Sequence, residues 1–366
     1  MDQRIDAMAK VLARYSTKIK KGDEVYLVGE VDTLPLMRAL YREAVDLEAH
    51  VHTLITDLDM KETLLRRGTD EQLLREPTLL RQVAEKADVT ISLWGESNTK
   101  ALSNVDVTRI GTRVKGTSAI KALFMEREGR NEIRWCGTQF PTSASAQDAA
   151  MSLSEYEDFV FGACLLDNGD PVAAWKEVGE RQETLCKMLD AKKELHIVSK
   201  DTDLTMRVEG RKWINCNGLQ NFPDGEVFTS PIEDSVEGTI RFSFPGISFG
   251  QEVENIRLVF KKGKVTEATA ARGEDVLKQI LTVDDGASGV GEIGIGTNYG
   301  IRKFTKNMLF DEKIGGTVHL AIGHSLPEAL GVNKSSIHWD MLCDMRDEGR
   351  IWADGELIYE KGNFII

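Results

Sequence analysis

The chain has 366 residues, of which 41% are apolar and 29% are charged. This length exceeds what one compact core usually holds, so we expect two domains, and the composition excludes a mainly disordered chain. Lys and Arg number 46 against 59 Asp and Glu, which gives a formal net charge of −13. An acidic surface of this kind repels phosphate backbones and anionic lipid headgroups, so neither nucleic acid nor a membrane is an expected partner.

Membrane and export signals are weak in this sequence. No apolar run approaches the roughly 20 residues that cross a bilayer. Residues 2–20 have the pattern of an amphipathic helix, with Asp and Arg where a signal peptide has its apolar stretch. The cysteines are odd in number and scattered without a CxxC pair, so we expect a cytoplasmic protein with unpaired thiols. They are Cys136, Cys164, Cys186, Cys216 and Cys343.

The first half of the chain alternates strand-like and helix-like segments. Short β-branched runs separated by helical periodicity are typical of a parallel sheet flanked by helices. Neither GxGxxG after the first strand nor GxxxxGK[ST] occurs, so the usual nucleotide-binding motifs are absent from the sequence. We therefore interpret residues 1–192 as an α/β domain that serves as scaffold and dimerisation surface. Its expected strands are 24–30, 50–56 and 87–95, with a helix near 34–44.

A helical stretch from about 147 to 193 follows, broken by a turn at Asn168, Gly169 and Pro171. After it, short strands alternate with Gly and Pro turns, with helical periodicity mainly around 274–281. The predicted second domain, residues 193–366, is β-rich α+β.

Half of the six histidines fall within 20 residues of the second domain: His319, His324 and His338. Strand alternation over 317–323 places His319 on the face opposite Val318 and its apolar partners, beside small residues. His324 has the opposite parity and lies at the strand exit, so we interpret it as a surface or supporting group.

Three carboxylates occupy comparable positions. Asp340 shares a face with His338, two residues away, and Glu292 shares a face with Gly294. Glu226 begins a strand directly after a tight Pro and Gly turn. Imidazole with several carboxylates suits Zn, Mn, Co or Fe, and a surplus of carboxylates allows one to bridge two ions about 3.5 to 4 Å apart. The sequence therefore predicts a metal centre in the second domain.

Simpler interpretations stand beside this one. A single histidine on a strand is more often a hydrogen-bonded core residue than a ligand. Glu226 and Glu292 taken alone would be solvated carboxylates, and the run GIGTNYG alone would be a glycine-rich turn. Only the combination favours a metal site.

Four runs in the second half resemble the M29 family of metalloaminopeptidases, the aminopeptidase T group. They are FPDGEVFTSPIEDSVEGTI, GEIGIGTNYG, LFDEKIGGTVHLAIG and SSIHWDM, in that order. The resemblance implies an N-terminal α/β domain, a C-terminal domain that carries the site, a homodimer and peptide substrates.

The resemblance also implies roles for individual residues. Glu292 would be a carboxylate bridging two divalent ions, Zn, Co or Mn, and Glu312 would be the general base. One departure concerns Leu326, where the family usually has a Tyr; Tyr299 is the nearest phenol in the motifs. The family's metal ligands match Glu226, Glu292, His319, His338 and Asp340.

Three hypotheses about function remain open at this point. The first is a metal-dependent aminopeptidase in which two ions polarise the scissile carbonyl and activate water. The second is a ring-cleaving dioxygenase similar to the 2,5-dihydroxypyridine dioxygenases, with one Fe(II) held by His319, His338 and Asp340. The third is a diverged, non-catalytic member. The presence of both Glu226 and Glu292 favours the aminopeptidase.

Overall fold

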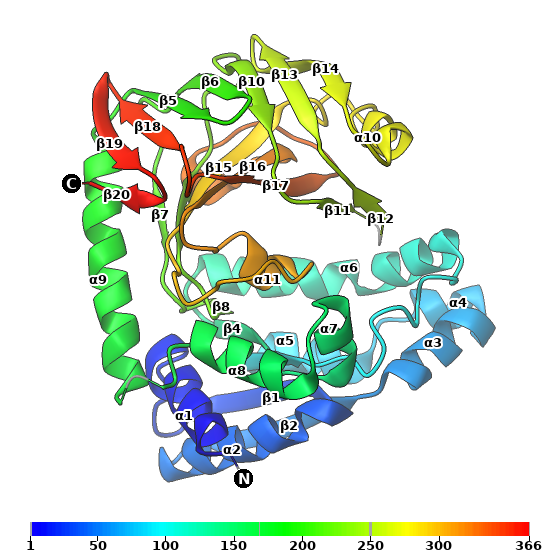
Figure 1. The fold of residues 1–366 in the computed structure, drawn as a ribbon. Helices are drawn as coiled ribbons and strands as arrows, with labels where there is room; N and C mark the ends of the chain where they lie inside the picture. Colours follow the sequence, from blue (N-terminus) through cyan, green and yellow to red (C-terminus); the bar gives the residue numbers. More distant parts are fainter. Residues whose placement is uncertain (1, 168, 249–250, 366) are drawn as a thin grey trace. The chain divides into compact units, whose positions relative to one another are not determined.

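The computed structural model describes residues 2–167, 169–248 and 251–365, which form two compact units (Figure 1). The first unit comprises 1–175 and 218–223, and the second comprises 176–217 and 224–366. The boundary expected after residue 192 falls just beyond the end of helix α9 (Pro171–Asp190), whose residues from Lys176 onward count with the second unit. Asn168, which we assigned to a turn, lies outside the described residues.

The first unit is built on a five-stranded parallel sheet in the order β2-β1-β3-β4-β8. Its strands are β1 (Glu24–Glu30), β2 (His50–Thr56), β3 (Val89–Trp94), β4 (Arg134–Gln139) and β8 (Asn221–Phe222). The helices of this unit are α1 (Gln3–Val11), α2 (Leu34–Asp46), α3 (Leu58–Arg67), α4 (Asp70–Leu74), α5 (Thr78–Lys86), α6 (Val107–Gly129), α7 (Ser143–Asp148) and α8 (Leu153–Ala163). The predicted parallel sheet with helices is confirmed.

Local sequence explains where several of these helices begin. Thr69 and Gln72 form a reciprocal capping box at the start of α4, and Ser152 and Glu155 form another at α8. Each box satisfies backbone N–H groups that have no partner within the helix. The helix expected over 2–20 is shorter, because α1 passes at Leu12 into a π-helix that ends at Ser16.

The second unit consists of antiparallel sheets. The larger sheet has the order β14-β13-β10-β6-β5-β18-β19-β20, and a five-stranded sheet has the order β17-β16-β15-β9-β7. The larger sheet contains β5 (Glu194–Ser199), β6 (Thr202–Arg207), β10 (Glu237–Arg241), β13 (Arg257–Lys261), β14 (Lys264–Thr269), β18 (Arg350–Ala353), β19 (Glu356–Glu360) and β20 (Asn363–Phe364). The smaller contains β7 (Ile214–Cys216), β9 (Glu226–Thr229), β15 (Val290–Gly296), β16 (Thr317–Gly323) and β17 (His338–Asp344). β11 (Gly246–Ser248) pairs with β12 (Gln251–Val253), and the helices are α10 (Glu274–Ile280) and α11 (Met308–Asp311).

One apolar core joins the two large sheets of this unit. Ile197 and Leu204 of the larger sheet belong to the same buried cluster as Val318 and Met341 of the five-stranded sheet. The apolar residues of β16 and β17 therefore face the core, as their alternation predicts, and the opposite face of these strands is left for polar side chains. The expected fold class is confirmed. Among the described residues, none of the helices combines the length and apolar character that a membrane crossing requires.

Candidate metal centre

Strand pairing in the five-stranded sheet brings the predicted ligands together. β16 lies between β15 and β17, with His319 opposite Gly294 and Ala321 opposite Asp340. β9 pairs with the other edge of β15, where Glu226 lies opposite Gly296. Residues up to 114 positions apart in the chain, from Glu226 to Asp340, thus meet on one face of one sheet.

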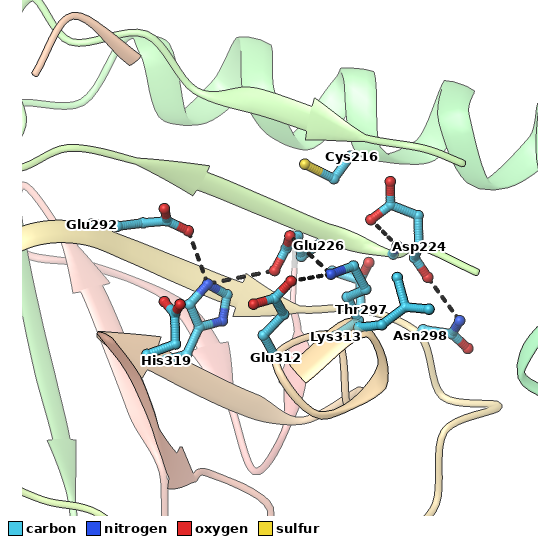
Figure 2. A network of polar contacts seen from close by, with 12 residues as sticks. Cys216, Asp224, Glu226, Glu292, Thr297, Asn298, Glu312, Lys313 and His319 are labelled. Atoms are coloured by element: carbon cyan, nitrogen blue, oxygen red, sulfur yellow. Dashed lines mark hydrogen bonds and ion pairs between the residues drawn. The ribbon is translucent and has the colours of Figure 1, made fainter. Parts of the chain in front are cut away.

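Glu292 lies between the two histidines. Its Oε1 is 3.1 Å from Nε2 of His319, and its Oε2 is 3.5 Å from Nε2 of His338. Glu226 Oε2 is 3.4 Å from the same His319 nitrogen, and Asp340 Oδ2 is 3.4 Å from the His338 nitrogen. Figure 2 shows the Glu226, Glu292 and His319 side of this arrangement. Each histidine therefore faces two carboxylates, and Glu292 is common to both groups.

The small residue opposite His319 is required by the packing. A Cβ on Gly294 would lie 2.0 Å from Nε2 and 2.1 Å from Cε1 of the His319 ring. No side chain fits at that distance, so any larger residue at position 294 displaces the imidazole. The glycine next to the predicted ligand thus forms the cradle that holds its ring.

A backbone contact sets the tautomer of His338. Its Nδ1 is 2.8 Å from the carbonyl oxygen of His324. Because a carbonyl only accepts, Nδ1 carries the hydrogen and donates it, which leaves Nε2 to face the carboxylates. His324 therefore contacts His338 through its main chain, while its side chain stays interpreted as a surface or supporting group.

Glu312 reaches the site from the C-terminal end of α11. Asn307 caps the start of this short helix by accepting a hydrogen bond from the Leu309 backbone N–H. The Glu312 carboxylate accepts a hydrogen bond from Nζ of Lys313, which also lies 3.5 Å from Oε1 of Glu226. The predicted base is therefore adjacent to a predicted ligand, with a lysine between them (Figure 2).

Burial and mutual repulsion shape the electrostatics of this cluster. Burial raises the pKa of Glu312 to about 8, and the Lys313 ammonium acts in the opposite direction. Burial also raises the pKa of Glu292. For His319, burial lowers the pKa, but the hydrogen bond with Glu292 and the charge of nearby carboxylates raise it to about 10. Protons on imidazole thus offset the carboxylate charge when no other cation is present.

The donor set fits a divalent ion. Oε2 of Glu226 and Oδ1 of Asp340 are buried and have no hydrogen-bond partner among the described residues. Buried polar atoms normally have partners, so these two carboxylate oxygens are available to a cation. Candidate ligand atoms of Glu292, His338 and Asp340 lie within 4.8 Å of one another. Two imidazoles with carboxylates suit Zn, Mn, Co or Fe.

A buried glutamine that the sequence did not single out holds the strand that carries Glu226. Gln182 of α9 directs its Nε2 to Asn215 Oδ1, to the Cys216 carbonyl and to the Glu226 carbonyl, each at 2.9 Å. Its Oε1 accepts a hydrogen bond from the Thr297 hydroxyl at 2.9 Å. Lys313, fully buried beside Glu226, was also not singled out, although it directly follows Glu312 in one of the quoted motifs. No spacing signal in the sequence connects either residue to the ligands.

Leu326, which stands where the family usually has a tyrosine, and Tyr299, the nearest phenol in the motifs, make contacts outside the carboxylate cluster. The Tyr299 hydroxyl donates to the Gly362 carbonyl at 2.9 Å, and the residue is 42% exposed. Leu326 is the N-cap of a short 3-10 helix, Pro327–Ala329. Neither residue brings a hydroxyl group to the carboxylates of the site in the contacts described.

Similarity to known proteins identifies this chain as a hydrolase of the metalloprotease class. The family model described as thermophilic metalloprotease (M29) matches residues 1–364, and the chain belongs to this family. The chain is 26% identical to Aminopeptidase 2 of Geobacillus stearothermophilus over 408 residues, covering 99% of this chain and 98% of that one. It is 26% identical to Aminopeptidase T of Thermus thermophilus over 402 residues, covering 98% and 96% of the two chains.

Two solved structures share the fold. Wild-type AmpT from Thermus thermophilus superposes with a TM-score of 0.87 at 23% identity, covering 100% of this chain and 99% of the other. The 2,5-dihydroxypyridine dioxygenase from Pseudomonas putida KT2440 superposes with a TM-score of 0.61 at 15% identity, covering 99% and 97%. The architecture therefore occurs in proteins with different reactions, and function has to be argued from the site.

Proposed function

We propose that this chain is a metal-dependent aminopeptidase that removes the N-terminal residue of peptides at a dinuclear centre. The observation that carries the proposal is the position of Glu292, whose two oxygens face two different histidines. A carboxylate in that position suits a bridge between two ions. The M29 family membership and the aminopeptidase names of the relatives support the reaction.

Two groups of ligands share Glu292. Glu226 and His319 would complete one group, and His338 and Asp340 would complete the other. The mixed nitrogen and oxygen donors favour Zn, Co or Mn as the ions. A bound divalent ion supplies Lewis acidity, which polarises the scissile carbonyl and lowers the pKa of the attacking water.

The protein's own residues supply proton transfer and orientation. In the proposed reaction the Glu312 carboxylate takes the proton of the attacking water and returns it to the leaving amine, a role that contributes about 10² to 10⁴ in rate. The His324 carbonyl orients His338, and the Gly294 cradle orients His319. His319 is fully buried, which keeps bulk water away from its imidazole.

We further propose that the chain forms a homodimer and works in the cytoplasm. The family resemblance supports the dimer, and exposed apolar side chains on α6 support association through the first unit. Val107, Val114 and Met125 of this helix are exposed. The five cysteines are free thiols, as in a reducing compartment. Sedimentation equilibrium of the wild type, compared with Val114→Glu, tests the dimer; a monomeric wild type would contradict it.

The function is tested by metal stoichiometry per subunit after anaerobic reconstitution with Zn, Co, Mn or Fe(II) in parallel. We expect two ions in the wild type and one or none in Glu292→Ala, with peptide cleavage reduced by about 10³-fold or more. Glu267→Ala is the matched control, because Glu267 lies on β14 with its side chain 70% exposed. This control should keep both ions and full activity.

Two outcomes would contradict the proposal. A single ion, preferentially Fe(II) and indifferent to the Glu292 substitution, would indicate the dioxygenase chemistry and call for oxygen-uptake assays with aromatic substrates. A wild-type protein that binds no divalent ion would indicate a non-catalytic member.

A further inference from the structure

Lys313 is a fully buried lysine that the reaction described above does not use. Its side chain is 0% exposed. It is the only lysine or arginine among the described buried side chains. Burying an ammonium group is very unfavourable unless it is paired and hydrogen-bonded, so its partners explain its presence.

The partners of Lys313 are both carboxylates of the candidate centre. Its Nζ donates to Oε1 of Glu312 and lies 3.5 Å from Oε1 of Glu226 (Figure 2). The other oxygen of Glu226, Oε2, is 3.4 Å from Nε2 of His319. One oxygen of Glu226 therefore faces the lysine, and the other faces the histidine and the site proposed for the ion.

The same ammonium lies beside a second acidic group. Candidate ligand atoms of Cys216, Asp224 and Glu226 lie within 4.8 Å of one another. Asp224 interacts electrostatically with Lys313. The Lys313 ammonium thus already compensates the negative charge of Asp224 and Glu226. This argues against a separate metal ion bound by Cys216, Asp224 and Glu226.

We propose that Lys313 is a positioning residue of the metal centre, which ties the base Glu312 to Glu226 and leaves only Oε2 of Glu226 for the ion. The catalytic part of this inference, the role of Glu312 as base, rests on the proposed function. Two like-charged carboxylates repel at short range, and the ammonium between them removes that repulsion. Without it, Glu312 loses the contact that sets its orientation toward the attacking water.

The test is a double-mutant cycle between Lys313→Met and Glu312→Gln, with Lys187→Met as the exposed-lysine control. At saturating Co(II), we expect Lys313→Met to lower kcat for L-leucine p-nitroanilide about 10²-fold. In the Glu312→Gln background, the same substitution should change kcat less than about threefold. An equal loss in both backgrounds would overturn the proposal, because the lysine would then act independently of Glu312.

Co(II) binding, measured by calorimetry, provides a readout besides activity. We expect Lys313→Met to bind Co(II) at least as tightly as the wild type, because a positive charge near the ion has been removed. Weaker binding, with kcat restored at saturating Co(II), would overturn the proposal and show that the lysine only supports the ligands.

Thermal unfolding of the metal-free proteins covers the case in which Lys313→Met folds poorly. We expect the double variant to have a higher unfolding midpoint than Lys313→Met alone, since it does not leave the Glu312 carboxylate partly buried and unpaired. If the double variant fails to fold while Glu312→Gln folds, the positioning role is wrong. A wild type without peptidase activity would contradict the proposed function, whereas the Co(II) and unfolding measurements would still decide the pairing of Lys313.

Discussion

The two units differ in the kind of polar side chain that they bury. The buried polar side chains of the first unit are neutral, such as Thr90, Thr138 and Gln139. Every acidic or basic side chain that is buried among the described residues lies in the second unit. They are Asp224, Glu226, Glu292, Asp311, Lys313, His319 and Asp340.

The second unit therefore contains the buried charges, which by themselves destabilise the folded state. Charged groups are rarely buried without a partner, because removing them from water is strongly unfavourable. In the second unit Glu226, Lys313 and His319 pair with one another or with Glu292, whereas Asp311 accepts hydrogen bonds from Thr305. The unpartnered oxygens of Glu226 and Asp340 are available to a cation. The first unit has the composition of a scaffold, and the second has that of a reactive site.

The largest expected effect comes from a Gly→Ala substitution beside the site in the second unit, compared with a Gly→Ala substitution in the first unit. Gly294→Ala places a Cβ against the His319 ring, so we expect Co(II) affinity to fall about 10- to 100-fold and kcat about 10²-fold. Gly111→Ala in α6 meets nothing within 4 Å and should stabilise the protein by about 0.5 to 1 kcal/mol.

Calorimetry with Co(II) and thermal unfolding measure both glycine variants. Unchanged Co(II) affinity in Gly294→Ala would show that the imidazole does not need the glycine cradle, and would weaken the assignment of His319 as a ligand.

A smaller effect is expected when a neutral, buried side chain that forms hydrogen bonds is replaced by an apolar one. Gln182→Leu leaves several polar groups of the strands around Glu226 without a partner, so we expect a loss of about 3 kcal/mol in unfolding free energy. Thr138→Val in the first unit removes one hydrogen bond, to the Phe222 carbonyl at 2.6 Å, and should lose about 1 kcal/mol.

Urea unfolding followed by circular dichroism compares the glutamine and threonine variants. If Thr138→Val were the more destabilising of the two, the support of β9 by the α9 glutamine would be less important than its contacts indicate.

The smallest effect concerns two carboxylates outside the buried core, one in each unit. Hydrogen bonds from the Ser336 backbone, from the Ser336 and Ser335 hydroxyls and from the Gly286 backbone lower the pKa of Asp284, in the segment between α10 and β15. Hydrogen bonds from Thr108 lower the pKa of Asp106 at the start of α6. A lowered pKa in the folded state stabilises above the unfolded pKa, about 3.9, and this contribution is lost as pH falls below it.

We therefore expect the unfolding midpoints of Asp284→Asn and Asp106→Asn to lie below that of the wild type from pH 5 to 7. Below about pH 4 the differences should shrink. Midpoint differences that stay constant down to pH 3 would show that these carboxylates act through shape rather than charge.

Periodicity in the sequence was sufficient to predict many of the strands and the faces that they bury. The strands expected at 24–30 and 50–56 are β1 and β2, and the alternation over 317–323 correctly separates the apolar core residues from His319. Alternation works here because successive side chains of a strand point to opposite faces, whatever the strand pairs with. The helix expected over 2–20 was too long, because amphipathic periodicity does not distinguish an α-helix from the π-helix into which it passes.

The residues around the ligands required the tertiary structure. Gln182 is 44 positions from Glu226, and nothing local marks it as a partner of that strand. Lys313 follows Glu312 in the chain, and lysines are rarely buried, so nothing local in the sequence marks it as a buried residue.

The sequence by itself determined which residue types lie on which face of each strand, because that depends on the local backbone alone. Only the tertiary structure decided that β9, β15, β16 and β17 are neighbours in one sheet, and that the two oxygens of Glu292 face different histidines. Strand order and register depend on contacts between residues far apart in the chain, where one core has to be filled by both large sheets at once. That long-range packing brings the individually ordinary histidines and carboxylates together as a candidate metal centre.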